Sequence, residues 1–233
     1  VLESVDSTML EAARRAVPGQ ALWVMARQQT AARGRRGRAW RHPSGNFSAT
    51  VVIWPEAPPA VLALRSFAMA LALRDTLAEL AGAGPALALK WPNDVLLSGG
   101  KVAGILLETL PHGGLAIGVG VNLLSAPPAD ALEPRALPPV SVLGETGLRL
   151  RPERVLDSLA VCFDAQEARL RAQGFGPLRD AWLAGAARLG EAVTARSPRQ
   201  TVSGIFQTVD DTGAIVLNTP DGPRAIAAAD IHF

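Results

Sequence analysis

Hydrophobic and polar positions in the first part of the chain predict a mixture of helices and short strands. The segment MLEAARRA contains good helix formers, and Thr8 and Glu11 have capping-box spacing, so we expect a helix over about 8–16. A long apolar-rich pattern predicts a second helix from Pro59 to Leu80, closed by Gly82. Short apolar or alternating runs, separated by Gly, Pro and Asp, predict strands at 21–27, 47–54, 86–90, 95–97, 102–109 and 115–123.

The second half of the chain has a different texture. Residues 125–139 contain five prolines and are expected to form a surface loop. Helical patterns follow over 152–173 and about 176–186. After Gly190 the pattern consists of short β-rich runs separated by Asp- and Gly-containing turns, which predicts a small antiparallel barrel of about 45 residues.

Composition is typical of a soluble globular protein and excludes several classes of site. Of the 233 residues, 48% are hydrophobic and 19% are charged, and no apolar run approaches the length of a membrane span. The first residues carry acids and no apolar signal segment, so we expect a cytoplasmic protein. The single cysteine, Cys162, excludes an internal disulfide, and the three histidines are too far apart in sequence to suggest a metal cluster. No base lies near Ser7 in the sequence to support a serine hydrolase.

Positive charge is concentrated in one segment. Residues 27–41 hold six arginines and no acid, whereas the net charge of the whole chain is only +2, so the rest of the chain is net acidic. Within this segment, Arg33 to Arg38 interleave guanidinium groups with glycines, which lets both side chains and backbone amides face an anion. The pattern is typical of a local anion site, and an RG-type nucleic-acid-binding loop stays open as the alternative.

The two lysines form a second unusual feature. All other basic residues among the 23 are arginine, and Lys90 and Lys101 lie eleven residues apart. Lysine is a compact point charge on a slim stem, so this segment is expected to need ammonium groups specifically. Asn93 and Asp94 supply an amide and a carboxylate suited to a magnesium shell or a polar relay, and Gly104 would let the backbone lie close to a flat ligand.

Five motifs occur in a characteristic order: DST, QTAARGRRGRAW, KWPND, GGKVAGILLE and GVGVN. In this order, over residues 5–123, the chain resembles the biotin protein ligase family. The resemblance implies an α+β fold, with a class II synthetase-like catalytic domain at 1–187 and a C-terminal SH3-like barrel at 188–233. It also implies the short form of the family, without the N-terminal DNA-binding domain.

The resemblance implies an ATP-dependent ligase that forms biotinyl-5′-AMP and transfers biotin to a lysine of a biotin carboxyl carrier protein. The implied biotin-binding residues are Ser7, Thr8, Gln29, Arg33, Gly34, Arg35, Lys101 and Gly104. The implied ATP- and adenylate-binding residues are Arg35, Arg36, Arg38, Lys90, Asn93 and Asn122. Mg²⁺ is expected to arrive with ATP. Ala32 and Met9 depart from the family pattern, which usually has glycine and asparagine there.

Elementary chemistry suggests catalytic roles for Lys101, Arg35 and Asp94. A biotin carboxylate must approach the α-phosphate of ATP, anion against anion, so Lys101 and Arg35 are expected at that junction. Asp94 is expected to position the attacking lysine or relieve it of a proton. The polar residues Ser7, Thr8 and Gln29 favour a ureido head group, although lipoate or octanoate transfer on the same fold stays open. No DNA or membrane partner is expected, and a homodimer is left open.

Overall fold

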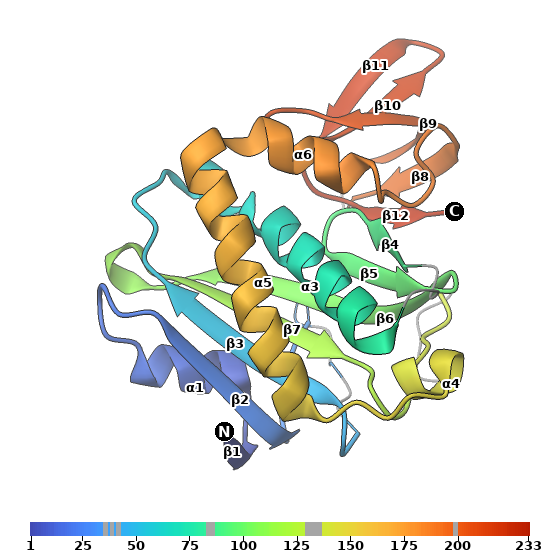
Figure 1. Cartoon of the computed structure of the whole chain (residues 1–233). Helices are drawn as coiled ribbons and strands as arrows, with labels where there is room; N and C mark the ends of the chain where they lie inside the picture. Colours follow the sequence, from blue (N-terminus) through green and yellow to red (C-terminus); the bar gives the residue numbers. More distant parts are fainter. Residues whose placement is uncertain (35–36, 38–39, 41–42, 83–86, 129–136, 198–199) are drawn as a thin grey trace.

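The computed structural model describes residues 1–34, 37, 40, 43–82, 87–128, 137–197 and 200–233. Two β-sheets dominate the described part of the chain, one of seven strands and one of five (Figure 1). In spatial order the larger sheet is β1-β2-β3-β7-β6-β5-β4, and the smaller is β11-β10-β9-β8-β12. The expected α+β architecture with a C-terminal β unit is therefore confirmed, whereas the predicted boundary between residues 187 and 188 stays a prediction.

The larger sheet is built almost entirely from antiparallel pairs. Its strands are β1 (Leu2–Val5), β2 (Leu22–Gln29), β3 (Phe47–Ile53), β4 (Leu87–Lys90), β5 (Asp94–Leu97), β6 (Gly100–Thr109) and β7 (Leu115–Val121). Among these pairs, only β1 and β2 run parallel. Six of the seven strands match the sequence prediction to within a few residues. The short strand β1 was not predicted, because its sequence LESV has too few residues to show an alternating pattern.

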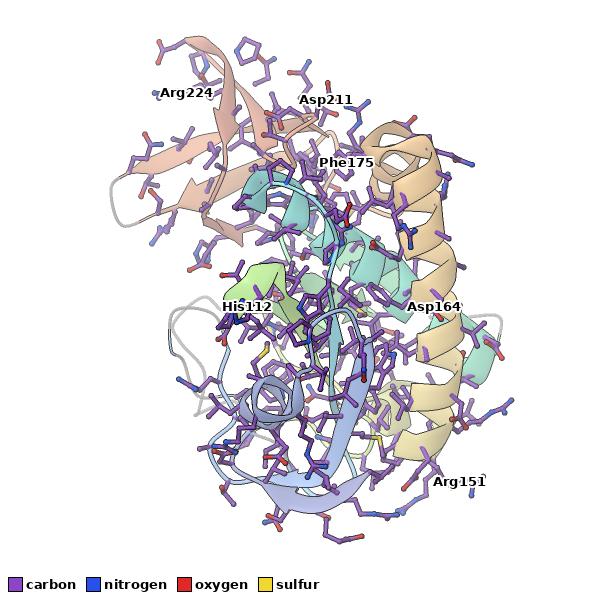
Figure 2. All side chains as sticks on the ribbon, turned by 90° about the vertical axis from the view of Figure 1, so that its left-hand side faces the viewer. His112, Arg151, Asp164, Phe175, Asp211 and Arg224 are labelled. Carbon is purple, nitrogen blue, oxygen red and sulfur yellow. The ribbon has the colours of Figure 1, made fainter. Side chains whose placement is uncertain are left out.

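Helices cover the two faces of the larger sheet unequally. On one face, α3 (Arg65–Ala81) and α5 (Pro152–Gln173) pack against each other and against the strands. On the opposite face, α1 (Thr8–Arg15) contacts β2, β3 and β7. Figure 2 shows α1 nearly end-on, with the sheet between it and α5. No helix in the described part of the chain is long and apolar enough to cross a membrane.

Alternation along the central strands decides which side chains face which helices. Odd-numbered positions of β3, β6 and β7 belong to the large apolar core beneath α3 and α5, as Phe47, Ile105 and Ile117 illustrate. Even-numbered positions face α1, where a small second cluster includes Met9 and Val52. Because successive side chains of a strand point to opposite faces, this period of two builds two different surfaces from the same strands.

The helix predicted over 59–80 is divided in the structure. It consists of α2 (Pro59–Leu62) and α3, with tighter i to i−3 hydrogen bonds between them, such as Leu64 N–H to the Val61 carbonyl. Leu62 and Leu64 are both buried. Both side chains thus join the large core at the point where α2 ends and α3 begins.

The predicted helices of the second half are present. Helix α5 begins and ends as the sequence predicted, and α6 (Phe175–Leu183) follows after Gly174. One short helix was not predicted: α4 (Val142–Thr146), whose N-cap Ser141 accepts a hydrogen bond from the Gly144 N–H. It lies immediately after the proline-rich segment, where residues 129–136 fall outside the described part of the chain.

The smaller sheet is antiparallel throughout. Its strands are β8 (Ala192–Arg196), β9 (Thr201–Val209), β10 (Ile215–Thr219), β11 (Gly222–Ile226) and β12 (Asp230–His232). Phe175, at the start of α6 near these strands in Figure 2, lies edge-on to Phe67 of α3 with ring centroids 5.1 Å apart. Aromatic side chains thus connect α3 with α6, the helix that contacts β9.

Candidate functional site

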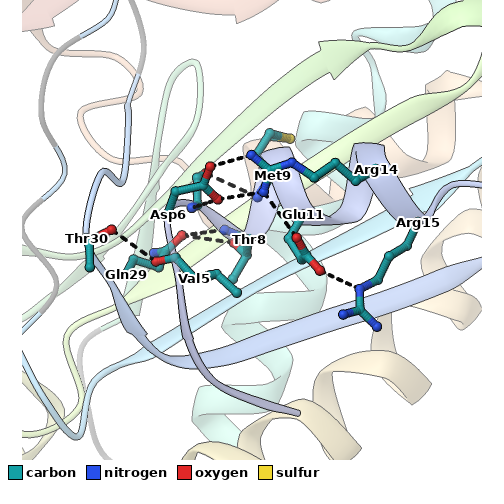
Figure 3. Close-up of polar contacts among 10 residues, drawn as sticks. Val5, Asp6, Thr8, Met9, Glu11, Arg14, Arg15, Gln29 and Thr30 are labelled. Atoms are coloured by element: carbon teal, nitrogen blue, oxygen red, sulfur yellow. Dashed lines mark hydrogen bonds and ion pairs between the residues drawn. The ribbon is translucent and has the colours of Figure 1, made fainter.

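The start of α1 gathers three of the predicted site residues. Ser7 is the N-cap, and its Oγ accepts a hydrogen bond from the Met9 N–H at 3.2 Å. The predicted capping box on Thr8 and Glu11 is therefore wrong by one position. Thr8 is instead the first helical residue, and its N–H and Oγ both donate to Gln29 Oε1, at 2.8 and 3.2 Å (Figure 3).

These bonds fix the orientation of the Gln29 amide. Because Oε1 accepts two hydrogen bonds from Thr8, the Nε2 amino group lies on the branch of the amide that is directed away from Thr8. Ser7 likewise uses its oxygen as an acceptor and keeps a hydroxyl proton to donate. Ser7 and Thr8 are both buried. The cluster can therefore offer donors and acceptors to a small polar group without rearranging α1.

A network of ion pairs at the protein surface surrounds the N-terminal end of α1. Arg14 donates to both carboxylate oxygens of Asp6 and also to Glu11, and Arg15 donates to Glu11 (Figure 3). The Arg14 hydrogen bond, with a further bond from the Ser7 N–H, lowers the pKa of Asp6 to about 2. Hydrogen bonds from Arg15 and Arg14 also lower the pKa of Glu11. Asp6 thus fixes the backbone of Ser7, next to the polar cluster.

Thr50 extends the polar cluster onto the floor of the sheet. It lies in the middle of β3, is fully buried, and donates through Oγ1 to Thr8 Oγ1 at 3.0 Å. Sequence analysis missed it, because a threonine within FSATVVIW is an ordinary strand residue. The signal was its even-numbered place in that alternating run, which puts it on the less apolar face.

Glycines form the floor beside Thr50. Gly118 is opposite Thr50 in β7, and Gly120 is opposite Gly104 of β6. A Cβ atom at Gly120 would come within 2.6 Å of the Trp40 indole, and one at Gly104 would lie 3.2 Å from it. The indole of Trp40 thus lies close to the Gly104 backbone, and the expectation that a flat ligand lies there stays a prediction.

Lys101 and Asp94 form an ion pair at the edge of this floor. Lys101 Nζ lies 2.6 Å from Asp94 Oδ1, and both side chains are only partly exposed. The ammonium also lies 5.5 Å from the centroid of the Trp40 ring. Asp94 is opposite Gly104 in the β5–β6 pair, so the ion pair stands on the face that carries the glycines.

The turn between β4 and β5 is fixed by contacts at each residue. Trp91 donates through its indole N–H to the Gly213 carbonyl at 2.9 Å, and Pro92 accepts from Ser66 Oγ at 3.0 Å. Asn93 Nδ2 donates to the Ile105 carbonyl. Trp91 is buried in the core. Asn93 thus anchors the turn to β6 in this structure.

The remaining predicted residues fall into two groups. Asn122 is buried just after β7 and donates through Nδ2 to the Val140 carbonyl at 3.1 Å, so its amide holds the segment that leads into α4. Arg33 is exposed and Gly34 is half-buried in the segment after β2. Arg35, Arg36 and Arg38 lie outside the described residues. The Trp40 N–H donates to the Ala32 carbonyl at 3.0 Å, which joins the two ends of this arginine-rich loop.

The polar cluster and the ion pair therefore share one face of the sheet. Strand spacing of about 4.8 Å and a rise of about 3.4 Å per residue put the Cα atoms of Thr50 and Gly104 roughly 12 Å apart. The floor between them is built by Gly118 and Gly120, and the side chains of Met9 and Trp40 lie against these glycines. Within the described part of the chain, no group of three or more His, Cys, Asp or Glu residues is placed to hold a metal ion.

Family models match both parts of the chain. Residues 1–123 match the Biotin/lipoate A/B protein ligase family, and residues 189–233 match the Biotin protein ligase C terminal domain. A biotin–[acetyl-CoA-carboxylase] ligase of Paracoccus denitrificans is 51% identical over all of this chain and 99% of its own length. The bifunctional ligase/repressor BirA of Bacillus subtilis is 30% identical, over all of this chain and 72% of its own length.

Solved structures agree on the fold. Biotin protein ligase from Aquifex aeolicus, in complex with biotin and ATP, superposes with a TM-score of 0.87 at 22% identity, covering 99% of this chain and 95% of the other. A biotin protein ligase from Leishmania major in complex with biotinyl-5-AMP gives a TM-score of 0.68 at 24% identity, covering 97% of each chain. With matches to both family models and a relative half identical along its full length, the chain belongs to the biotin protein ligase family.

Proposed function

We propose that this chain is an ATP-dependent biotin ligase that acts on the biotin carrier of acetyl-CoA carboxylase. The observation that carries this proposal is the 51% identity, over the whole chain, to a biotin–[acetyl-CoA-carboxylase] ligase. The reaction has two steps. The biotin carboxylate attacks the α-phosphate of ATP and pyrophosphate leaves; a carrier lysine then attacks the biotinyl carbonyl and AMP leaves.

The polar cluster at α1 suits the head group of biotin. A ureido group carries two N–H donors and one carbonyl acceptor, and Gln29 Nε2 and the Ser7 hydroxyl provide donors for that carbonyl. The glycines beyond Thr50 would let the flat bicyclic rings and the five-carbon tail lie close to the backbone, once the side chains of Met9 and Trp40 that cover Gly118 and Gly120 move aside. An extended ligand anchored at Gln29 and lying along the floor from Thr50 to Gly104 would then bring its carboxylate toward Lys101.

Lys101 is assigned to the first step. Its ammonium is the described cation nearest the glycine floor, and it is held by a carboxylate and an aromatic ring. When the biotin carboxylate and the α-phosphate approach each other, Lys101 can exchange its bond with Asp94 for bonds to the incoming anions. A preorganised cation at the point where negative charge accumulates lowers the barrier most. We assign Arg35, Arg36 and Arg38 to the same anions on the basis of their motif.

Asp94 is assigned to the second step. Once Lys101 interacts with the adenylate, the Asp94 carboxylate becomes available to accept a hydrogen bond from the carrier's lysine. A carboxylate there would orient the amine and receive its proton as the amide bond forms. Lys90, opposite Asp94 in the β4–β5 pair, is assigned to the phosphates, with Asn93 and Asn122 fixing the backbone on either side.

Magnesium is assigned to ATP and not to a protein site. The chemistry of the residues argues for this, since Asp94 is neutralised by Lys101 and Asn93 is used by the backbone of β6. Bound to the phosphates, Mg²⁺ would supply countercharge for the departing pyrophosphate. The protein's own contribution is the cations and the polar cluster at the start of α1.

Carrier labelling tests this proposal. The chain is incubated with ATP, Mg²⁺, biotin and the biotin-carrier domain of an acetyl-CoA carboxylase, and the carrier is weighed by intact-mass spectrometry. We expect the mass of one biotinyl group to be added, and none on a carrier whose acceptor lysine is replaced by arginine. A parallel reaction with lipoate or octanoate addresses the other acids handled within this family. Labelling by those acids in preference to biotin would overturn the assignment.

A further inference from the structure

The segment that carries Lys90 is also the joint between the two sheets. The Leu89 N–H donates to the Gly185 carbonyl, and the Leu89 carbonyl accepts from the Ala187 N–H, both at 2.8 Å. Trp91 bonds to Gly213 of the turn between β9 and β10. Lys90 thus stands between two anchored neighbours, at the edge of the larger sheet and facing the C-terminal unit.

An aromatic ring from the C-terminal unit meets Lys90 at this joint. Phe233 follows β12, and its ring centroid lies 5.6 Å from Lys90 Nζ. The same ring lies 5.2 Å from the guanidinium carbon of Arg188, which is itself paired with Glu191 at 2.6 Å. Two cations share one aromatic ring, and the electron-rich face of the ring attracts each of them.

The contact limits where the Lys90 ammonium can go. A free lysine side chain samples many rotamers, and fixing it costs conformational entropy at the moment a ligand binds. A ring that holds the ammonium beforehand lowers that cost, so the ligand meets a preorganised cation. Lys90 is opposite Asp94 in the β4–β5 pair, and the Asp94 carboxylate already pairs with Lys101. Lys90 therefore lies in the part of the site that is assigned to the nucleotide phosphates.

We propose that Phe233 is a positioning residue for ATP, because its ring holds the Lys90 ammonium at the joint between the two sheets. The proposal rests on the function proposed above and adds to it a specific contribution from the C-terminal unit. Phe233 acts through Lys90 and is not a catalytic residue. Its removal is expected to weaken ATP binding and to leave the polar cluster at α1, at the other end of the glycine floor, unaffected.

The test compares variants at the joint by biotin-dependent release of pyrophosphate. Phe233→Leu retains an apolar side chain but loses the aromatic ring, and Phe233→Trp restores a ring. We expect Phe233→Leu to raise KM for ATP about five-fold, the scale of a partly exposed cation–π contact, with kcat and KM for biotin changed less than about two-fold. Phe233→Trp is expected to recover most of the wild-type KM.

Asp211→Asn is the matched control. It breaks the Arg179–Asp211 ion pair, which also joins α6 to the C-terminal unit but does not touch Lys90. We expect its KM for ATP to stay at the wild-type value. In a Lys90→Met background, Phe233→Leu is expected to have no further effect on KM for ATP, because the cation through which the ring acts on ATP is gone.

Three results would overturn the proposal. An unchanged KM for ATP in Phe233→Leu would remove the role of the ring, and so would an equal rise in Asp211→Asn, which would indicate general loosening of the joint. A rise that persists in the Lys90→Met background would show that Phe233 acts through another group. Failure of the wild-type protein to release pyrophosphate with biotin would instead refute the proposed function on which this proposal rests.

Discussion

The two faces of the seven-stranded sheet carry different kinds of side chain on the same strands. Toward α3 and α5, the odd-numbered positions of β3, β6 and β7 are filled by large apolar residues such as Phe47, Ile105 and Ile117. Toward α1, many even-numbered positions are small or polar: Ser48, Thr50, Gly104, Gly118 and Gly120. Because side chains alternate along each strand, one face of the sheet is a packing surface and the other is a binding surface.

The two faces therefore contribute to different properties, one to stability and the other to function. Each large side chain buried beneath α3 and α5 contributes roughly 1.5–3 kcal/mol to folding, whereas the glycine floor buries almost no side-chain surface. The floor instead leaves space close to the backbone, which Trp40 and the Lys101 stem share. Mutations on the two faces should therefore separate: one face changes the free energy of unfolding, and the other changes turnover or substrate affinity.

The largest effect is expected on the packing face, from Glu167→Ala. Glu167 of α5 receives two hydrogen bonds from Arg65 of α3, at 2.8 and 3.2 Å, and the Arg65 side chain is only 4% exposed. Removing the carboxylate leaves a buried guanidinium without its partner, which costs about 3–5 kcal/mol in free energy of unfolding. Urea denaturation measures this cost.

The matched control for this variant joins the same two helices. Glu79 of α3 accepts a hydrogen bond from Ser158 of α5 at an exposed position, and Glu79→Ala is expected to change stability by less than about 1 kcal/mol. At urea concentrations below its unfolding transition, Glu167→Ala should still form biotinyl-adenylate at close to the wild-type rate. A stable Glu167→Ala protein with lost activity would contradict the separation of the two faces.

The second effect belongs to the binding face. Lys101→Ala should slow adenylate formation by about 100-fold or more, the scale for losing one transition-state donor, with little change in stability. Lys101→Arg tests whether charge alone suffices, and we expect it to stay well below wild type because a planar guanidinium cannot place a compact point charge at the position of Nζ beside Asp94 and Trp40. Single-turnover formation of adenylate gives the rate; equal rates for wild type and Lys101→Ala would remove Lys101 from the mechanism.

The strand pattern made much of this division predictable. The alternation in FSATVVIW and the pair of glycines in GVGVN both lie in strands as expected, and α5 has the predicted bounds. Motif order also pointed to Lys101, Asp94 and Gly104, which the structure brings together.

The sequence did not predict the contacts between distant segments. Thr50 joins the polar cluster through Thr8, 42 residues away in the chain, and the joint at Lys90 depends on Phe233 at the far end. The N-cap of α1 was misplaced for the same reason, because Gln29 takes the Thr8 N–H that a local capping box would have used. Local patterns carry no information on such tertiary competition for hydrogen bonds.

A smaller effect is expected from Thr50→Val. This change preserves shape but removes the hydroxyl that donates to Thr8, so Thr8 and the Gln29 amide lose part of their fixed orientation. We expect KM for biotin to rise about five-fold, in line with the loss of one buried hydrogen bond, and kcat to change less. Initial rates over a range of biotin concentrations measure this, and Thr50→Ser should restore the wild-type value.

The matched control for Thr50 lies beneath the packing face. Thr76 of α3 is also fully buried, and its Oγ1 has no hydrogen-bond partner among the described residues. Thr76→Val should leave KM for biotin unchanged and be neutral or slightly stabilising, since it removes an unpaired polar group. If both variants raised KM equally, the hydroxyl of Thr50 would have no specific role.

The smallest effect concerns pH. Hydrogen bonds from Arg14 and the Ser7 N–H lower the pKa of Asp6 from 3.8 to about 2. The ionised form is favoured in the folded state, so its contribution is complete above pH 4 or so and is lost as the pH falls toward 2. Asp6→Asn should therefore flatten the stability profile between these values, as followed by urea denaturation. An identical acid profile for both proteins would show that the exposed network does not stabilise α1.

The central claim is that a biotin carboxylate is activated on the glycine floor beside Lys101, and pyrophosphate release without any carrier tests it most directly. Mixing the chain with ATP, Mg²⁺ and biotin should release pyrophosphate in a rapid phase close to one equivalent per protein molecule, followed by slow release as retained adenylate escapes. Omitting biotin should abolish the rapid phase. Pyrophosphate release that is independent of biotin, or none when biotin is present, would contradict the account.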